Sequence, residues 1–260
     1  MPPVRPKKHL GQHFLKDENI ARKIVDCLTE PGNVLEIGPG TGVLTKYLFT
    51  RISNLQLIEI DRESVDFLHQ TFPELASPII NADFLKFNLS SLFNSQFAII
   101  GNFPYNISSQ IFFKIIENRV LIHEVVGMVQ KEVAERLASP PGNKTYGILS
   151  VLLGAFYEIK YLFTVSENVF TPPPKVKSAV IRLTRKENFN LGCDEKLFFD
   201  VVKTSFNQRR KTMRNSLRKY WQEETNPDEF PIFQKRPEQL DYTEFVELVK
   251  WLSLNSTEKP

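Results

Sequence analysis

The sequence predicts an α/β fold, with a mainly parallel β-sheet covered by helices on both faces and a small all-helical domain after it. Two observations predict the sheet. Apolar strand-like segments alternate with helical segments, and a glycine-rich turn connects the first such strand to a helix. A third observation predicts the second domain, because only helical periodicity remains after Arg185. For a chain of 260 residues we expect domains over residues 1–185 and 186–260.

The expected strands are apolar runs bounded by turn residues, and residues 148–157 between two of them have the composition of a buried helix. The last two strands flank a proline-rich loop, so they could pair antiparallel. No internal repeat is visible. The seven expected strands are residues 33–38, 56–61, 78–83, 97–102, 123–130, 160–165 and 177–184.

In the second domain the clearest expected helices are residues 196–202 and 241–254. Asp241 and Glu244 form a capping-box pattern at the start of the second helix. Its expected core face consists of Phe245, Val246, Leu248, Val249 and Leu252. Residues after Ser256 are expected to fray.

The glycine-rich turn contains Gly38, Gly40 and Gly42 and follows the apolar run that ends at Ile37. Such a strand–glycine–helix order brings backbone close to a nucleotide. Val43 stands where a dinucleotide fingerprint needs its third glycine, and no Lys-Ser/Thr pair follows, as a P-loop would require. A cofactor with a ribose but no phosphate fits better. The alternative is a tight turn that binds nothing.

Acidic residues end two of the expected strands. Glu59 lies at the interval at which an acid meets the ribose hydroxyls in nucleotide-binding folds. Asp61 precedes a helical pattern, so we expect it to cap that helix. Asp83 could accept a hydrogen bond from an adenine amine, or it could be a turn or cap residue.

Asn102-Phe103-Pro104-Tyr105 follows another apolar strand and has the residue types needed to hold a flat base by its amine. Asn102 offers a side-chain carbonyl, the carbonyl before Pro104 can turn into a pocket, and Tyr105 offers a face for stacking. The alternative is an ordinary turn.

Residues 203–219 contain seven basic residues and no acidic one. On a helix, Phe206, Met213 and Leu217 would share one face, leaving the basic side chains to point elsewhere. Solvated helix faces normally mix charges of both signs, so this run predicts RNA contact by Arg209, Arg210, Lys211 and Arg214. Lys7, Lys8 and His9 could extend the same surface or form a basic tail.

Composition sets further limits. Hydrophobic residues make up 42% of the chain, enough for a sizeable core, and 33 basic against 30 acidic residues give a net charge of only +3. Affinity for nucleic acid must therefore come from clustered charges. Cys27 and Cys193 have no metal-like spacing, so we expect free thiols in a reducing cytosol, and no metal site. No apolar signal core or membrane-spanning run is visible, so we expect a cytoplasmic protein.

Taken together, these motifs resemble the KsgA family of ribosomal-RNA adenine dimethyltransferases, among the class I S-adenosylmethionine (AdoMet) methyltransferases. The resemblance covers nearly the whole chain. Two departures are Phe103, where Leu or Ile is commoner, and Lys177, where Asp is usual. The matching segments are residues 7–15, 36–45, 102–106, 129–134, 170–176 and 209–214.

The resemblance implies a Rossmann-like, seven-stranded methyltransferase sheet and AdoMet as cofactor. It implies that the segment carrying His13 and Leu15 closes over the AdoMet pocket. Gly38, Glu59, Asp83 and Asn102 complete the implied cofactor site. It also implies a substrate: two adjacent adenines in a hairpin near the 3′ end of small-subunit RNA, presented on an immature 30S particle. We expect the protein to act as a monomer.

The implied reaction moves a methyl group to the amine of an adenine that has left its stack. We expect Asn102 and the carbonyl before Pro104 to orient the amine, and Tyr105 and Phe170 to stack on the base; the alternative for Phe170 is a core aromatic. Two other functions remain open: methylation of large-subunit RNA, as in erythromycin-resistance enzymes, and a non-catalytic role in ribosome assembly. Methylation of DNA adenine is disfavoured, because such enzymes often carry Asp where Asn102 stands. A nicotinamide dehydrogenase is disfavoured by Val43.

Overall fold

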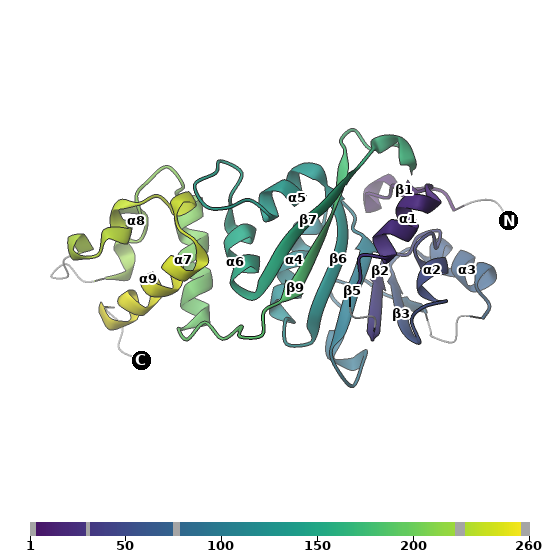
Figure 1. Ribbon diagram of the computed structural model, residues 1–260, viewed down its shortest axis with the longest axis horizontal. Helices are drawn as coiled ribbons and strands as arrows, with labels where there is room; N and C mark the ends of the chain where they lie inside the picture. The colour runs from purple at the N-terminus through teal and green to yellow at the C-terminus, as the bar shows by residue number, and fades with distance from the viewer. Residues whose placement is uncertain (1–3, 30–31, 75–78, 222–226, 256–260) are drawn as a thin grey trace. The chain divides into compact units, whose positions relative to one another are not determined.

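The computed structural model describes residues 4–29, 32–74, 79–221 and 227–255 and contains a seven-stranded sheet (Figure 1). The strand order is β4-β3-β2-β5-β6-β9-β7. Neighbouring strands from β4 to β6 run parallel, and β9 runs antiparallel to β6. The strands are β2 (Asn33–Ile37), β3 (Asn54–Glu59), β4 (Ile79–Asn81), β5 (Phe97–Asn102), β6 (Ile122–Gln130), β7 (Tyr157–Val165) and β9 (Ser178–Arg185).

Each of the seven expected strands has a counterpart, so the predicted sheet is confirmed. Strands β7 and β9, on either side of the proline-rich loop, are neighbours. Residue 157 begins β7 instead of ending the preceding helix. The expected start of β4 at residue 78 lies outside the described residues.

Both faces of the sheet are buried, as a central parallel strand requires. Successive side chains of β5 point to opposite faces. Ala98 and Ile100 join a core cluster with helix α1, whereas Phe97 and Ile99 point the other way and are also at most 1% exposed. The helices that accompany the sheet are α1 (Glu18–Val25), α2 (Thr45–Leu48), α3 (Arg62–Thr71), α4 (Ser108–Glu117) and α5 (Lys131–Leu137).

A second, two-stranded sheet was not expected from the sequence. It pairs β1 (Phe14–Leu15) antiparallel with β8 (Phe170–Thr171), residues more than 150 positions apart. Leu15 and Phe170 both belong to the core cluster that includes α1. This pairing fixes the amino-terminal segment next to the glycine-rich turn, because Phe14 contacts Gly40.

The chain divides into two compact units: residues 1–134 with 158–185, here called the sheet unit, and residues 135–157 with 186–260, the helical unit. The expected domain boundary, after residue 185, is one of these junctions, but residues 135–157 group with the carboxy-terminal helices. The boundary between functional domains stays a prediction. The helical unit contains α6 (Ile148–Phe156), α7 (Glu195–Asn207), α8 (Met213–Ser216) and α9 (Tyr242–Asn255).

Helix α9 confirms the predicted capping box. The Asp241 side chain accepts from Glu244 N at 2.9 Å, and the Glu244 side chain accepts from Asp241 N at 3.1 Å. The five residues of its predicted core face are all buried. Within the described part of the chain, no helix combines the length and apolar character needed to cross a membrane.

Candidate functional site

The glycine-rich turn after β2 shapes one wall of a cavity. Gly38 has φ +64°, in the left-handed region that favours glycine, and a Cβ there would meet no atom within 4 Å. Gly40 has φ +56°, and its Cβ would lie 2.8 Å from the Phe14 ring. The backbone at Gly38 is therefore open to the cavity, as close approach of a ligand requires.

Glu36 ties this turn to the helix that follows it. Its carboxyl group is 1% exposed and accepts a hydrogen bond of 2.7 Å from the Thr45 hydroxyl, at the start of α2. Burial raises the pKa of Glu36 to about 8, although the Thr45 hydrogen bond opposes this and the nearby Glu59 charge adds to it. Glu36 is therefore protonated in the folded protein at neutral pH.

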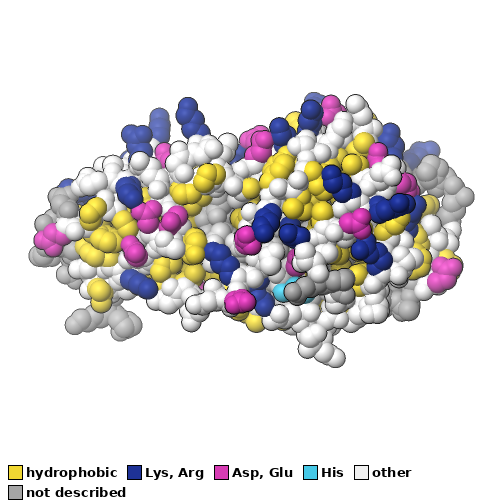
Figure 2. All heavy atoms as spheres, in the orientation of Figure 1, with side chains coloured by type: hydrophobic (Ala, Val, Ile, Leu, Met, Phe, Trp, Pro, Cys, Tyr) yellow, Lys and Arg dark blue, Asp and Glu magenta, His cyan; other side chains and the backbone are white. Residues whose placement is uncertain are grey.

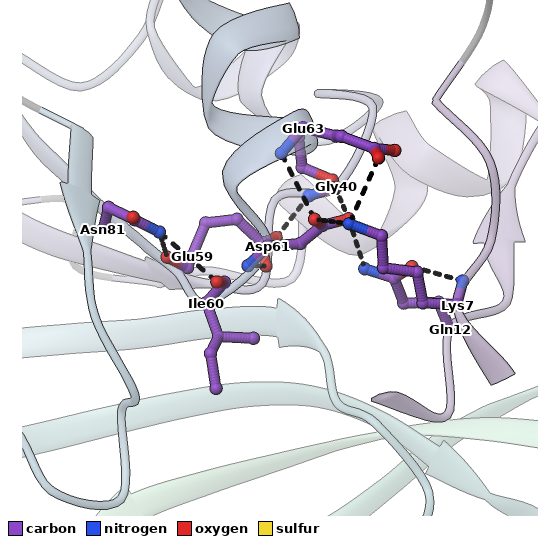
Figure 3. Close-up of polar contacts among 9 residues, drawn as sticks. Lys7, Gln12, Gly40, Glu59, Ile60, Asp61, Glu63 and Asn81 are labelled. Carbon is purple, nitrogen blue, oxygen red and sulfur yellow. Dashed lines mark hydrogen bonds and ion pairs between the residues drawn. The ribbon is translucent and has the colours of Figure 1, made fainter. Parts of the chain in front are cut away.

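Glu59 occupies the position predicted for a ribose-binding acid, at the end of β3 (Figure 3). It is 4% exposed, and its two oxygens accept from Gly40 N at 3.1 Å and Asp61 N at 2.9 Å. Burial raises its pKa despite these two hydrogen bonds. The next residue, Ile60, is 51% exposed and lines the same cavity, and sequence analysis missed it. Its position directly after a strand-end acid is the sequence signal that could have identified it.

Asp61 caps helix α3 as predicted, accepting from Glu63 N at 3.2 Å. It also binds the Lys7 ammonium group, and it accepts from Gln12 Nε2 at 3.2 Å (Figure 3). Burial alone would raise the pKa of Asp61, but the bonds from Lys7, Gln12 and Ser64 hold it below its ordinary value. Lys7 is thus engaged in a salt bridge within the protein, and its contribution to an RNA-binding surface stays a prediction.

The segment of residues 7–13, here called the strap, is anchored by Asp61 and covers the cavity. Its own residues Lys7 and Gln12 are joined by a 2.8 Å bond from the Lys7 N–H to Gln12 Oε1. Residues 10–13 line the cavity. The strap therefore connects the Lys7–Asp61 salt bridge, at the start of α3, to the cavity wall.

Asp83 lines the cavity and also caps a turn, so its expected turn function is confirmed and its contact with an adenine amine stays a prediction. Its Oδ1 accepts from Leu85 N at 2.9 Å. Phe84, missed from the sequence, lines the cavity beside it. Lys114 of α4 donates to the carbonyls of Leu85 and Phe87 at 2.9 and 2.6 Å, which fixes the turn that carries Asp83.

Asn102 is oriented by the strap. Its Nδ2 donates to the His13 carbonyl at 2.8 Å, so the side-chain oxygen is directed as an acceptor. The Tyr105 ring stacks on His13 at 5.4 Å between centroids and 26° between planes, and its hydroxyl is hydrogen-bonded to Ser178. His13 Nδ1 in turn lies 2.8 Å from the Pro172 carbonyl oxygen.

Two cavities meet at His13 and Tyr105. The first contains about 720 Å³ of empty space, some of it open to solvent. It brings together most of the predicted site residues: His13, Gly38, Glu59, Asp83, Asn102, Pro104 and Tyr105. The second contains about 1150 Å³ and is lined by Lys8, Gln130 and residues 172–176 in addition to His13 and Tyr105.

Leu15 and Phe170 do not line the first cavity. Leu15 is 3% exposed and Phe170 is 1% exposed, and the two residues face each other across the β1–β8 pair in the core. In this conformation Phe170 is a core aromatic, which was the alternative expectation, and its ring is not exposed for stacking. Cofactor contact by Leu15 and stacking by Phe170 stay predictions that would need this pair to move.

The basic run of residues 203–219 lies in the helical unit and is not one helix. Helix α7 ends at Asn207, and α8 begins at Met213, so the expected single helical face is wrong, although Met213 and Leu217 are fully buried. Arg209 lies 3.7 Å from Glu238 and donates to the Asn143 carbonyl at 3.3 Å. Arg210, Lys211 and Arg214 are exposed.

The face of the molecule shown in Figure 2 carries charges of both signs, with Lys and Arg side chains interspersed with Asp and Glu side chains. Among the described residues, no group of three His, Cys, Asp or Glu side chains is arranged to hold a metal ion. Cys27 and Cys193 are free thiols, as expected.

Residues 4–252 of the chain match the ribosomal RNA adenine dimethylase family. Ribosomal RNA small subunit methyltransferase A of Parabacteroides distasonis is 60% identical over 247 residues, which cover 94% of this chain and 93% of that protein. The protein of the same name from Flavobacterium johnsoniae is 59% identical over 253 residues, covering 96% and 97%.

Solved structures agree with the match. A dimethyladenosine transferase from Plasmodium falciparum superposes with a TM-score of 0.78 at 25% identity, covering 93% of this chain and 96% of that one. The 23S rRNA methyltransferase ErmE gives a TM-score of 0.71 at 25% identity, covering 91% and 99%. The fold is therefore that of a class I methyltransferase, and the chain is an enzyme of the ribosomal RNA adenine dimethylase family.

Proposed function

We propose that this enzyme uses AdoMet to dimethylate two adjacent adenines in the 3′-end hairpin of 16S ribosomal RNA on an immature small subunit. Family membership and the names of the relatives support the substrate class. The observation that carries the proposal is the position of Asn102, which lines the first cavity and donates to the carbonyl of His13, a residue that lines both cavities. Such a substrate would place the enzyme in the cytoplasm, and we expect it to act there as a monomer.

The first cavity is lined by groups suited to binding AdoMet. Gly38 offers open backbone, Glu59 is a buried carboxylate suited to a ribose diol, and Asp83 could accept from an adenine amine. Ile60 and Phe84 supply apolar walls for the adenine ring. AdoMet, when bound, supplies an electrophilic methyl group on a sulfonium centre.

The protein's part in the transfer is to orient the acceptor nitrogen. The lone pair of an adenine amine is delocalised into the ring, so the nitrogen is a weak nucleophile until it becomes more tetrahedral. Hydrogen bonds from its two N–H groups to the Asn102 side-chain oxygen and the Phe103 carbonyl would favour that geometry. Asn102 has no titrating group, so the contribution is positioning and electrostatics, without prior proton abstraction.

The second cavity suits the entering base. Extruding an adenine costs a few kcal/mol, and stacking on one aromatic ring returns about 1–3 kcal/mol. Tyr105 lines both cavities, although His13 already stacks on its ring. Lys8 and Lys175 at the same cavity could neutralise flanking phosphates.

Substitution of Asn102 tests the proposal. Asn102→Ala removes the acceptor and should lower single-turnover methyl transfer to immature small subunits by about 10²-fold or more, while AdoMet binding stays within several-fold. The matched control is Asn94→Ala, in an exposed loop, which should leave both unchanged. Near-normal transfer by Asn102→Ala would refute the proposed chemistry.

The same experiment separates the alternatives. Mass spectrometry of the RNA would reveal modification of the large subunit instead of the small one. If the Asn102→Ala variant complemented cells that lack the protein as well as the wild type did, a mainly non-catalytic assembly role would be favoured.

A further inference from the structure

The ring of Phe103 lies across two glycines of neighbouring strands. Gly101 of β5 and Gly127 of β6 are partners in the strand register. A Cβ on Gly101 would lie 3.1 Å from Cε1 of Phe103, and a Cβ on Gly127 would lie 2.6 Å from Cε2 of the same ring. The ring therefore occupies the space that side chains at these two positions would need.

The Phe103 ring lies in close-packed surroundings. It is 0% exposed, and the Phe112 ring packs against it edge-on, with centroids 5.9 Å apart. A Cβ on Gly101 would also lie 2.5 Å from the Ile37 carbonyl oxygen, so the backbone is close on that side as well. Since protein interiors are close-packed, a group added at Gly127 would have to push the Phe103 ring.

A displaced ring would displace the residues proposed to act on the substrate. Phe103 stands between Asn102 and Pro104, and its own carbonyl is the second proposed acceptor. Its N–H donates to the Met128 carbonyl at 3.0 Å, so the ring and this hydrogen bond together fix the backbone of the loop. A Cβ at 2.6 Å needs about 0.8 Å more to reach an ordinary contact of 3.4 Å. Misplacement of about 1 Å can cost 10²-fold in rate.

We infer that Gly127 and Phe103 are a complementary pair of positioning residues that set the acceptor geometry of the loop. Gly127 has to lack a side chain because Phe103 has a large one. Gly127 and the Phe103 ring act by positioning, through Asn102 and through the backbone carbonyl of Phe103 that is proposed to accept from the substrate. This inference rests on the proposed function of that loop.

The test combines a glycine substitution with a compensating one. Gly127→Ala should lower the single-turnover rate of methyl transfer by about 10- to 100-fold while changing the AdoMet dissociation constant less than about threefold. Adding Phe103→Leu removes the Cε2 atom that the new Cβ would meet. The double variant should then transfer methyl groups within about threefold of Phe103→Leu alone. The matched control is Gly32→Ala, whose Cβ would meet nothing within 4 Å and which should behave as the wild type.

Two results would overturn the inference: Gly127→Ala as fast as the wild type, or a double variant no faster than Gly127→Ala. If thermal unfolding measurements show that Gly127→Ala does not fold, the double variant provides the test. An active double variant supports the complementary pairing of Gly127 with Phe103, and an unfolded or inactive one contradicts it. Absence of transfer by the wild type would refute the proposed function instead. The pair would then be judged by whether Phe103→Leu restores the thermal stability lost in Gly127→Ala.

Discussion

The buried carboxyl group of Glu36 predicts a pH-dependent stability that one substitution should abolish. Its pKa is raised from 4.5 to about 8 in the folded protein, because its carboxylate would be buried beneath the glycine-rich turn. Between these values the folded state binds more protons than the unfolded chain, so the free energy of unfolding falls as pH rises from 4.5 to about 8. At about 1.4 kcal/mol per pH unit, the loss over this range is about 5 kcal/mol at most.

Glu36→Gln keeps an oxygen for the Thr45 hydroxyl but has no titrating group. Urea unfolding of both proteins at about pH 5, 7 and 9 measures the effect. The stability of the variant relative to the wild type should increase by about 3–5 kcal/mol from the lowest to the highest pH. Glu74→Gln, an exposed control, should show no such trend. A stability difference between Glu36→Gln and the wild type that is independent of pH would refute the reasoning.

Three further predictions concern the strap, the RNA surface and the core. Lys7→Gln removes the salt bridge to Asp61 and should raise the AdoMet dissociation constant, measured by calorimetry, several-fold. The neighbouring change Lys8→Gln should leave this constant unchanged. Equal effects of the two changes would exclude an anchoring role of Lys7 for the strap. Replacing Arg210 and Lys211 with Gln should lower the log–log salt dependence of RNA binding by about 0.7–0.9 per lost phosphate contact, and an unchanged slope would assign them to a solvated surface. Phe170→Ala should cost about 3–5 kcal/mol of stability. Phe170→Leu should restore both stability and methyl transfer if the residue serves only the core. A stable Leu variant that has still lost methyl transfer would favour stacking on the base.

Local patterns in the sequence were enough to predict the sheet and several polar residues of the cavity wall. Gly38, Glu59, Asp83 and Asn102 all lie at or just beyond strand ends, and parallel strands bring their carboxyl ends to one edge. Their proximity in space therefore follows from the strand pattern alone. The capping functions of Asp61 and Asp241 were predictable for a similar reason, since each depends on residues at most three positions away.

Contacts between distant segments could not be predicted. The pairing of β1 with β8 buries Leu15 and Phe170, and nothing near either residue in the sequence indicates its partner. The bond from Lys7 to Asp61 joins residues 54 positions apart, so Lys7 resembled part of a basic tail. The interruption between α7 and α8 was missed because burial of Met213 and Leu217 is equally compatible with a continuous helix.

The most direct test of the account is a single-turnover reaction of the purified protein with isotopically labelled AdoMet and immature small subunits, followed by mass spectrometry of the RNA nucleosides. The account predicts labelled N6,N6-dimethyladenosine at two adjacent positions near the 3′ end of the small-subunit RNA. Label found only in another nucleoside, or no label although AdoMet binds, would contradict it.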